Sequence, residues 1–353
     1  MIRLTINQQT IEVKKGCTLL EASKQLGLSI PTLCHKEDLD KHTSCMVCVV
    51  EETQSGKLLP SCTALAEHGM TVQTDSESVF QARQSALNLL LSEHVGDCEA
   101  PCQLVCPAHM NIPLMLRQIS ANQLDDAIQT VKDRIAIPAV LGRICPAPCE
   151  KGCRRKQVDE PVSICLLKRF AADMDLSSDK PYLPEIKKRS GKHVVIVGAG
   201  PAGLSSAYYL LIQGHQCTMI DTCKAPGGKL RTELSEALLP KSILDSEIAI
   251  IEKLGLKFQA KKILGKDVTL RKLQNKYDAV VLTLGEIDEQ GVRALGLESS
   301  ERGIKIHPKT HMTSLSGVFS GGNATHPGKL AVRSAGHGWA IAQSVHQFLN
   351  GSE

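Results

Sequence analysis

Cysteine is the residue type whose number and spacing carry most of the chemistry in this sequence. Eleven of the fourteen cysteines lie between residues 34 and 165, in three groups. The groups are Cys34, Cys45, Cys48 and Cys62; Cys98, Cys102 and Cys106; and Cys145, Cys149, Cys153 and Cys165. Intervals of two or three residues place neighbouring thiolates on one small loop, where they can converge on one metal ion or cluster.

Two interpretations of this spacing compete. A disulfide framework is typical of small secreted domains that have few core residues. This chain has 353 residues, and its first residues, Met-Ile-Arg-Leu-Thr, have no secretory pattern. We therefore interpret the cysteines as ligands of iron–sulfur clusters or metal ions.

The composition limits the class of protein. A chain of 353 residues predicts two or three domains, and 42% hydrophobic with 22% charged residues is typical of a soluble globular protein. The net charge of +4 is scattered and only 3% of residues are aromatic, which argues against nucleic-acid binding. No apolar run approaches the roughly 18 residues of a membrane span. We expect a cytoplasmic protein of anaerobic metabolism.

The first cysteine group follows a short α+β pattern. Residues 2–13 alternate apolar and polar around Gln8 and Gln9, which predicts a β-hairpin. Thr18, with Glu21 at the third helical position, predicts a capped helix to Gln25. The cysteine intervals of ten, two and thirteen residues suit a [2Fe–2S] cluster, in which each iron takes two thiolates. A four-cysteine zinc site is the alternative, because it also uses a two-residue gap.

Residues 30–35, 44–51, 60–62 and 68–72 resemble a known ferredoxin domain. This domain opens the large iron–sulfur subunit of respiratory NADH dehydrogenase and many iron-only hydrogenases. The resemblance spans residues 1–78 and implies that Cys34, Cys45, Cys48 and Cys62 hold a [2Fe–2S] cluster. Cys17 matches no ligand position, and we expect it to be a buried small apolar residue.

Residues 79–190 are predicted to be mainly helical. Helical patterns cover residues 79–92, 112–119 and 124–131. Prolines at positions 107, 146 and 148 are expected to stop helices at the cysteines and leave the thiolates on loops. Residues 181–190, rich in proline and charge, predict a linker.

The second and third cysteine groups lie in motifs that can be compared with a family. Residues 98–107, 142–150 and 161–164 resemble the N-terminal domain of the small subunit of bacterial glutamate synthase and of dihydropyrimidine dehydrogenase. That domain holds two [4Fe–4S] clusters with interleaved ligands. The resemblance implies one cluster on Cys98, Cys102 and Cys153, and the other on Cys106, Cys145 and Cys149.

Each of these clusters lacks a fourth ligand. For the first, His94 is the candidate, because a histidine in a similar Leu-Leu-Ser-x-His run ligates a cluster in the NADH dehydrogenase and hydrogenase family; a structural histidine is the alternative. For the second, the family places Glu or Gln where this chain has Lys168, which cannot ligate. Cys165 lies one helical turn earlier and is the candidate. A buried thiol, with an incomplete or absent second cluster, is the alternative.

Residues 191–353 contain a dinucleotide fingerprint. A buried strand at 192–197 leads into Gly198-Ala-Gly200-Pro201-Ala202-Gly203 and an apolar helix, and a second strand at 216–220 ends in Asp221. The glycines let the backbone approach a pyrophosphate at the helix N-terminus, and the carboxylate accepts hydrogen bonds from ribose hydroxyls.

Three further motifs resemble the flavin-binding loops of the glutamate synthase family and imply FAD. Their candidate contacts are Gly228, Lys229, Leu230 and Arg231; Thr283 and Gly285; and Gly322 and Asn323, followed by Leu330 and Ala331 at the start of the last helix. The relatives carry Asp where this chain has Asn323, which can still hydrogen-bond but has no charge. The helix dipole at Ala331 would favour an anionic reduced flavin. A Rossmann-type scaffold without flavin is the alternative.

One segment of the family is missing. In the relatives a second Rossmann domain lies between the strand that ends near Gly285 and the closing glycine motif. Here only residues 286–302 separate Gly285 from Gly303, whereas a nucleotide domain needs on the order of 100 residues. The resemblance therefore implies that the chain does not bind NAD(P)H in the family's way.

Together these patterns predict a multidomain protein with an α+β ferredoxin-like domain (1–78), an α-helical double-cluster domain with linker (79–190) and an α/β Rossmann-type FAD domain (191–353). We expect an electron-transfer subunit of a multisubunit oxidoreductase, because no catalytic acid, base or nucleophile is identifiable. Its partners would be subunits of formate dehydrogenase, hydrogenase, aldehyde oxidoreductase or diaphorase type, with ferredoxin as a further candidate. The alternatives are a stand-alone flavin reductase of ferredoxin or quinone, and a structural scaffold subunit.

Overall fold

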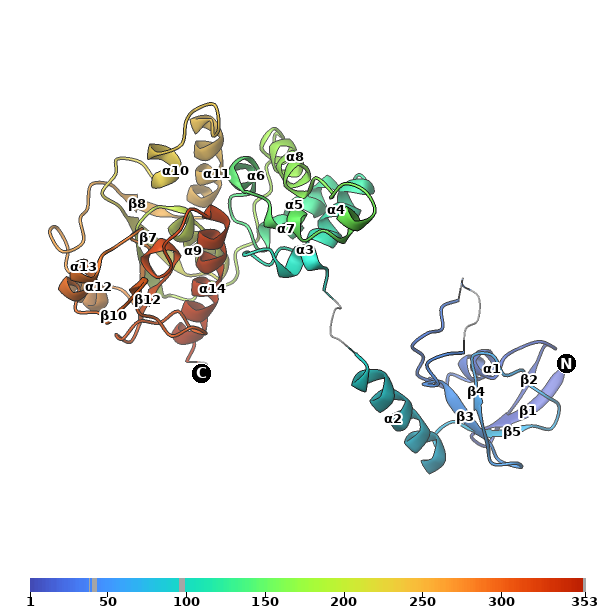
Figure 1. Cartoon of the computed structure of the whole chain (residues 1–353). Coiled ribbons are helices and arrows are strands. Elements are labelled where there is room, and N and C mark those ends of the chain that lie inside the picture. The colour runs from blue at the N-terminus through green and yellow to red at the C-terminus, as the bar shows by residue number, and fades with distance from the viewer. Residues whose placement is uncertain (38, 40–42, 95–98, 352–353) are drawn as a thin grey trace. The chain divides into compact units, whose positions relative to one another are not determined.

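The computed structural model describes residues 1–37, 39, 43–94 and 99–351. The chain divides into two compact units, Met1–Asp97 (unit 1) and Cys98–Glu353 (unit 2), each with its own core (Figure 1). Within the described residues, no helix combines the length and the apolar character that a membrane crossing requires. The predicted domain boundaries at residues 78 and 190 stay predictions.

Unit 1 is built on a five-stranded sheet of order β2-β1-β5-β3-β4. Its strands are β1 (Ile2–Ile6), β2 (Gln9–Val13), β3 (Val49–Glu52), β4 (Lys57–Pro60) and β5 (Thr71–Gln73). The predicted hairpin is confirmed, because β1 and β2 pair antiparallel from Ile2↔Val13 to Ile6↔Gln9. The alternation of the two strands buries Leu4 and Ile6 in the core.

Helix α1 (Leu19–Gln25) covers this core and begins as predicted. The Thr18 hydroxyl accepts a hydrogen bond from the Glu21 N–H at 3.2 Å, and the Thr18 N–H donates to the Glu21 carboxylate at 2.9 Å. This reciprocal capping box satisfies two N–H groups that the helix itself leaves unpaired. Leu19 and Leu20 are buried by the helix.

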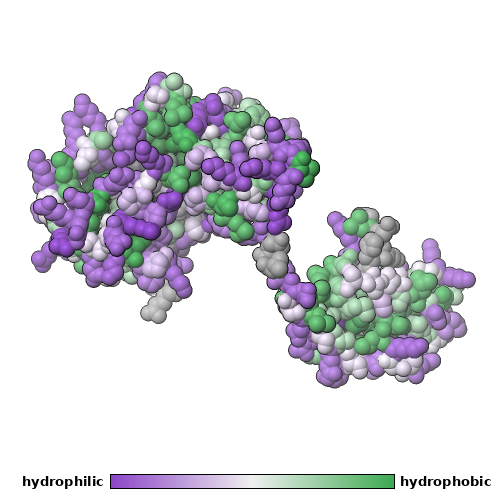
Figure 2. All heavy atoms as spheres, viewed as in Figure 1, coloured by the Kyte–Doolittle hydropathy of each residue, from purple (hydrophilic) through white to green (hydrophobic). Residues whose placement is uncertain are grey.

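Helix α2 (Glu77–Ser92) begins two residues before the predicted start and is capped by Ser76. Of its residues only Val79 is buried. Phe80, Leu89 and Leu91 are each more than 60% exposed, and apolar side chains are visible at the surface of unit 1 in Figure 2. Helix α2 is therefore held to unit 1 through Val79 and through Arg83, which donates a hydrogen bond to the Val49 carbonyl at 2.7 Å.

The first part of unit 2 is helical, as predicted. It comprises α3 (Pro101–Leu104), α4 (Ile112–Ser120), α5 (Leu124–Lys132), α6 (Pro138–Ile144), α7 (Pro148–Lys151), the 3₁₀ turn η1 (Arg154–Gln157) and α8 (Ile164–Leu176). The expectation that Pro148 stops a helix is wrong. Pro148 occupies the first position of α7, where a missing N–H costs nothing, and Pro101 does the same in α3. Cys102 and Cys149 consequently lie in short helices rather than in loops.

The second part of unit 2 is a five-stranded parallel sheet of order β12-β9-β6-β7-β8. Its elements are β6 (His193–Val197), α9 (Pro201–Ile212), β7 (Gln216–Ile220), α10 (Lys229–Thr232), α11 (Lys241–Lys253), β8 (Lys257–Gln259), α12 (Leu270–Lys276), β9 (Ala279–Leu282), α13 (Glu289–Ala294), β10 (Ser299–Ser300), β11 (Gly303–Ile304), β12 (Val318–Ser320), η2 (Gly322–Ala324) and α14 (Ala331–Leu349). Helices α9 and α14 lie side by side against the sheet (Figure 1).

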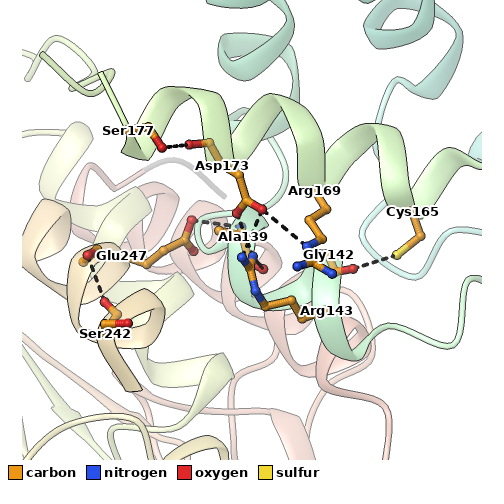
Figure 3. Close-up of polar contacts among 10 residues, drawn as sticks. Ala139, Gly142, Arg143, Cys165, Arg169, Asp173, Ser177, Ser242 and Glu247 are labelled. Atoms are coloured by element: carbon orange, nitrogen blue, oxygen red, sulfur yellow. Dashed lines mark hydrogen bonds and ion pairs between the residues drawn. The ribbon is translucent and has the colours of Figure 1, made fainter. Parts of the chain in front are cut away.

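The helical part and the sheet part of unit 2 share one hydrophobic core. Met115 and Leu141 from the helices belong to the same buried cluster as Leu204 and Tyr208 from α9. Two buried hydrogen bonds also join the parts, since the Tyr209 hydroxyl donates to the Lys132 carbonyl at 2.9 Å and the Ala139 N–H donates to Glu247 Oε1 at 2.9 Å (Figure 3).

Glu247 generates a prediction about pH. Its side chain is buried and its second oxygen has no hydrogen-bond partner, and burial raises its pKa from 4.5 to about 8. A raised pKa in the folded state means that the stability contribution is full below about pH 4.5 and is lost as pH rises through about 8. We expect Glu247→Gln to remove this loss, so that the variant gains on the wild type as pH rises. Denaturant unfolding across this pH range measures the effect.

Glu252→Gln, an exposed change on the same helix, is the matched control. It should keep the pH profile of the wild type. Parallel profiles for wild type and Glu247→Gln would contradict the buried neutral carboxyl.

Candidate cofactor sites

The hairpin β3–β4 positions half of the first cysteine group. Cys48 immediately precedes β3 and Cys62 follows β4, and the pairing of Val49 with Pro60 brings the two ends together. The Ser61 hydroxyl donates to the Cys48 carbonyl at 2.7 Å, which fixes this end of the hairpin. Cys48 and Cys62 are buried.

The four thiols of this group interact with one another. The Cys34 thiol is held by hydrogen bonds from the Ser44 and Cys45 backbone, which lower its pKa to about 6. Burial raises the pKa of Cys62 to about 11, with a hydrogen bond to the Cys48 thiol and the charge of Cys34 adding to the rise. Soft thiol donors gathered on loops around a hairpin fit a cluster with two ligands for each iron. Cys17, which matched no ligand position, is half-buried.

The second site draws on α3 and on the end of α7. Burial raises the pKa of Cys102, and the charges of Cys153 and Cys106 add to this. Gly152 allows the end of α7 to pack closely on Val105, because a Cβ at this position would lie 2.9 Å from a methyl group of Val105. Cys98 lies outside the described residues. His94 is exposed at the end of α2 and belongs to unit 1, so its role as a ligand stays a prediction.

The third site lies where α6 ends against α8. Cys165 Sγ is 3.6 Å from the Gly142 carbonyl oxygen (Figure 3). It is 3.8 Å from the Leu141 carbonyl oxygen. A hydrogen bond between the Cys145 and Cys165 thiols lowers the pKa of Cys145 to about 6 and raises that of Cys165. Gly142 is required here, because a Cβ would lie 2.6 Å from the Arg169 Cβ.

Cys149 and Cys106 complete this third group. Both are buried, and burial raises the pKa of Cys149 to about 12, with the charges of Cys106 and Cys145 adding to the rise. Electrostatic interactions connect Cys106, Cys145, Cys149 and Cys165 with one another, and Cys106 also interacts with Cys102. Among the described residues, no three His, Cys, Asp or Glu side chains are arranged to hold a single metal ion.

The glycine fingerprint is shaped for a dinucleotide. A Cβ at Gly203 would lie 2.0 Å from the Gly198 carbonyl oxygen, so the start of α9 packs directly on the turn after β6. A Cβ at Gly200 would meet no protein atom within 4 Å, which leaves open space at the N-terminus of the helix. Asp221 Oδ2 accepts a hydrogen bond from the Ala199 N–H at 2.7 Å. These features fit a pyrophosphate above the helix and a ribose beside the carboxylate.

The loop before α10 lies against this turn. Gly228, in a left-handed conformation, would place a Cβ 3.0 Å from the Gly200 Cα, and the Gly227 N–H donates to the Ala199 carbonyl at 2.8 Å. Leu230 is buried. Arg231 donates a hydrogen bond to the Pro226 carbonyl and forms an ion pair with Asp245. The Lys229 ammonium group lies 3.4 Å from the Glu233 carboxylate, so both cations have protein partners.

The strands that return to the fingerprint hold the other candidate residues. The Thr283 hydroxyl donates to the Gly198 carbonyl at 2.9 Å, which ties β9 to the glycine turn. Gly285 has a φ of 81° and open space around it. The Asn323 amide donates to the Gly328 carbonyl at 2.8 Å and so closes the turn that leads to Leu330 and Ala331 at the start of α14.

From the sequence, His337 is expected to be a surface or flavin-adjacent histidine rather than a catalytic one, and its role in this turn is not predicted. His337 Nδ1 accepts a hydrogen bond from the Gly322 N–H at 3.1 Å, and burial lowers the pKa of His337 to about 4. The neutral ring thus orients the glycine turn that carries Asn323. No local signal could have revealed this contact, because it joins α14 to a turn fifteen residues earlier.

Three protein families match consecutive parts of the chain. A 2Fe-2S iron–sulfur cluster binding domain matches residues 1–77. A 4Fe-4S cluster domain described as domain II of dihydropyrimidine dehydrogenase matches residues 79–180, and a pyridine nucleotide-disulphide oxidoreductase domain matches residues 167–340. These matches confirm the coarse domain types, a 2Fe-2S domain, a 4Fe-4S domain and a flavin-type oxidoreductase domain, whereas two clusters in the second domain stay a prediction.

Relatives share large parts of these domains. The chain is 35% identical over 244 residues to the NADPH-Fe(3+) oxidoreductase subunit beta of Geobacter sulfurreducens, covering 69% of this chain and 36% of that protein. It is 37% identical to the NADP(+)-dependent formate dehydrogenase subunit beta of Moorella thermoacetica, covering 53% of this chain and 29% of the other. It is 32% identical to the glutamate synthase [NADPH] small chain of Bacillus subtilis, covering 58% and 43%. The chain thus spans less than half the length of each of these relatives.

Substitutions at two glycines of the fingerprint test stability and FAD binding separately. We expect Gly203→Ala to lower the free energy of unfolding by roughly 1–3 kcal/mol, because its Cβ would overlap the Gly198 carbonyl. Gly200→Ala, whose Cβ meets only open space, should leave the unfolding of the flavin-free chain unchanged but reduce the FAD that copurifies with the chain. Denaturant unfolding and flavin absorbance measure the two effects. Full flavin content in Gly200→Ala would contradict this position for the pyrophosphate.

Proposed function

We propose that this chain, which joins a [2Fe–2S] domain, a domain II of dihydropyrimidine dehydrogenase type and a flavin-type oxidoreductase domain and is related to the glutamate synthase small chain, is an electron-transfer subunit of an oxidoreductase complex. FAD and the clusters would carry electrons between a partner subunit and another carrier. A flavin can exchange two electrons with one partner and single electrons with clusters.

The connection between β9 and β12 carries this proposal. Residues 283–317 form only the short helix α13 and the two-residue strands β10 and β11 before the chain re-enters the sheet. This segment is far too short for a second nucleotide-binding sheet. The flavin would therefore exchange electrons through the clusters or a partner rather than with a nicotinamide held by this chain.

We assign the ligands as the sequence predicts. Cys34, Cys45, Cys48 and Cys62 would hold one [2Fe–2S] cluster; Cys98, Cys102 and Cys153 with His94 one [4Fe–4S] cluster; and Cys106, Cys145, Cys149 and Cys165 another. The interactions among the thiols of the first and third sets support this grouping. For the second set, the support is the electrostatic contact of Cys102 with Cys153.

The packing of α14 supports a short route from flavin to cluster. A Cβ at Gly336 would lie 2.4 Å from the Pro107 carbonyl oxygen, so α14 presses directly on the residue after Cys106. The same helix begins at the turn of Asn323, next to the glycine fingerprint. The first turns of α14 thus contact both the segment that follows Cys106 and the turn that carries Asn323.

The names of the relatives suggest the class of complex. The relative from Moorella thermoacetica is named as a subunit of a formate dehydrogenase, and that from Geobacter sulfurreducens as a subunit of an Fe(3+) oxidoreductase. We propose partners of formate dehydrogenase, hydrogenase, aldehyde oxidoreductase or diaphorase type, with ferredoxin as a candidate soluble carrier.

The source of electrons can be tested on the purified chain. We expect dithionite to bleach the bound flavin, whereas NADH and NADPH should leave it oxidised when no partner is present. Anaerobic absorbance spectroscopy measures this, with the chain plus its copurified partner subunits as the comparison. Rapid bleaching by either nucleotide would show that this chain has a nicotinamide site of its own.

A further inference from the structure

Lys168 is a buried cation beside the third cysteine group. It lies on α8, three residues and about one turn after Cys165, and it is only 4% exposed. Its positive charge acts on Cys145, Cys149 and Cys165 and lowers the pKa of each thiol, whereas burial raises the pKa of all three. Residues three apart lie on one face of a helix, so Lys168 shares the buried face of α8 that carries Cys165.

The Lys168 ammonium group has no direct partner in the part of the chain that the structure describes. None of the described residues forms a hydrogen bond or ion pair with the Lys168 side chain. Lys132, the other strongly buried lysine of the helical part, is 2.7 Å from Asp175 and also donates to the Tyr182 carbonyl. Because burying an unpaired ammonium is costly, Lys168 is expected to face an anion.

Glu150 is a carboxylate whose charge acts on Cys145 and Cys149, as that of Lys168 does, but no ion pair within 4.0 Å joins it to Lys168. Glu150 Oε1 accepts a hydrogen bond from the Cys165 N–H at 2.8 Å, at the first turn of α8, where a negative charge is favourable. Arg169, the next residue along α8, differs from Lys168 in its exposure to solvent. Arg169 is about half exposed and lies 3.3 Å from Asp173 (Figure 3). Of these two successive cations on α8, Lys168 is buried and Arg169 is exposed to solvent.

We propose that Lys168 is the internal counter-ion of the [4Fe–4S] cluster held by Cys106, Cys145, Cys149 and Cys165, and that it raises the reduction potential of that cluster. The inference rests on the proposed function, because it needs this cluster to be present. Four thiolates give the buried centre a net negative charge, and reduction adds another electron. A fixed positive charge nearby stabilises the reduced form more than the oxidised form.

The test is a redox titration of the anaerobically purified full chain, followed by electron paramagnetic resonance, together with an iron count. We expect Lys168→Met to keep the iron content and to lower the potential of one [4Fe–4S] signal. A shift of about tenfold in the ratio of reduced to oxidised cluster at fixed ambient potential corresponds to about 59 mV. Lys168→Arg, which keeps the charge, should restore the wild-type potential. Arg169→Met removes a neighbouring exposed cation and should cause no shift.

Each outcome decides the matter. Loss of one cluster in Lys168→Met but not in Lys168→Arg would also support the counter-ion, since both variants replace the lysine side chain but only Lys168→Arg keeps a positive charge. Equal potentials in wild type and Lys168→Met, or loss of the cluster in both variants, would overturn it while the proposed cluster set stands. A wild-type chain with only one [4Fe–4S] signal would instead refute the assignment of the third site, and the inference with it.

Discussion

The close contact between α14 and the segment that follows Cys106 is the constraint on which unit 2 depends. Gly336 meets the Pro107 carbonyl, and a Cβ at Gly338 would lie 2.5 Å from the Ala202 carbonyl oxygen. Both approaches exclude any side chain. Helix α14 is therefore clamped between a cysteine-bearing segment on one side and the first turn of the fingerprint helix α9 on the other. This arrangement converts two sequence modules into one packed body.

Unit 2 also buries several charged side chains. Lys132 pairs with Asp175 and Arg143 with Asp173, each across two helices of the cysteine-bearing part. Breaking such a pair would leave an uncompensated buried charge, which costs several kcal/mol. Glu247 avoids that cost in another way, since burial favours its neutral form. Lys168 differs from Lys132, Arg143 and Glu247, because it is buried without a carboxylate partner among the described residues. We therefore relate its charge to the neighbouring cysteines.

The parts of the fold that the sequence predicts well are those with local signals. The capping box of Thr18 and Glu21 and the strand that ends before Asp221 lie where their patterns indicate. The short helices around Cys102 and Cys149 are not predicted, because a proline before a cysteine can either stop a helix or occupy its first position. The contacts of His337 and Glu247 also escape, since each joins elements that only tertiary packing brings together.

The central claim is that one chain holds two kinds of iron–sulfur cluster together with a flavin. Mössbauer spectroscopy of the anaerobically purified, isotopically enriched full chain tests it most directly, with flavin measured on the same sample. The account predicts about ten irons per chain, about one fifth of them in a [2Fe–2S] cluster and the rest in [4Fe–4S] clusters, beside one FAD. Protein without flavin that contains only zinc, or about two irons, would contradict it.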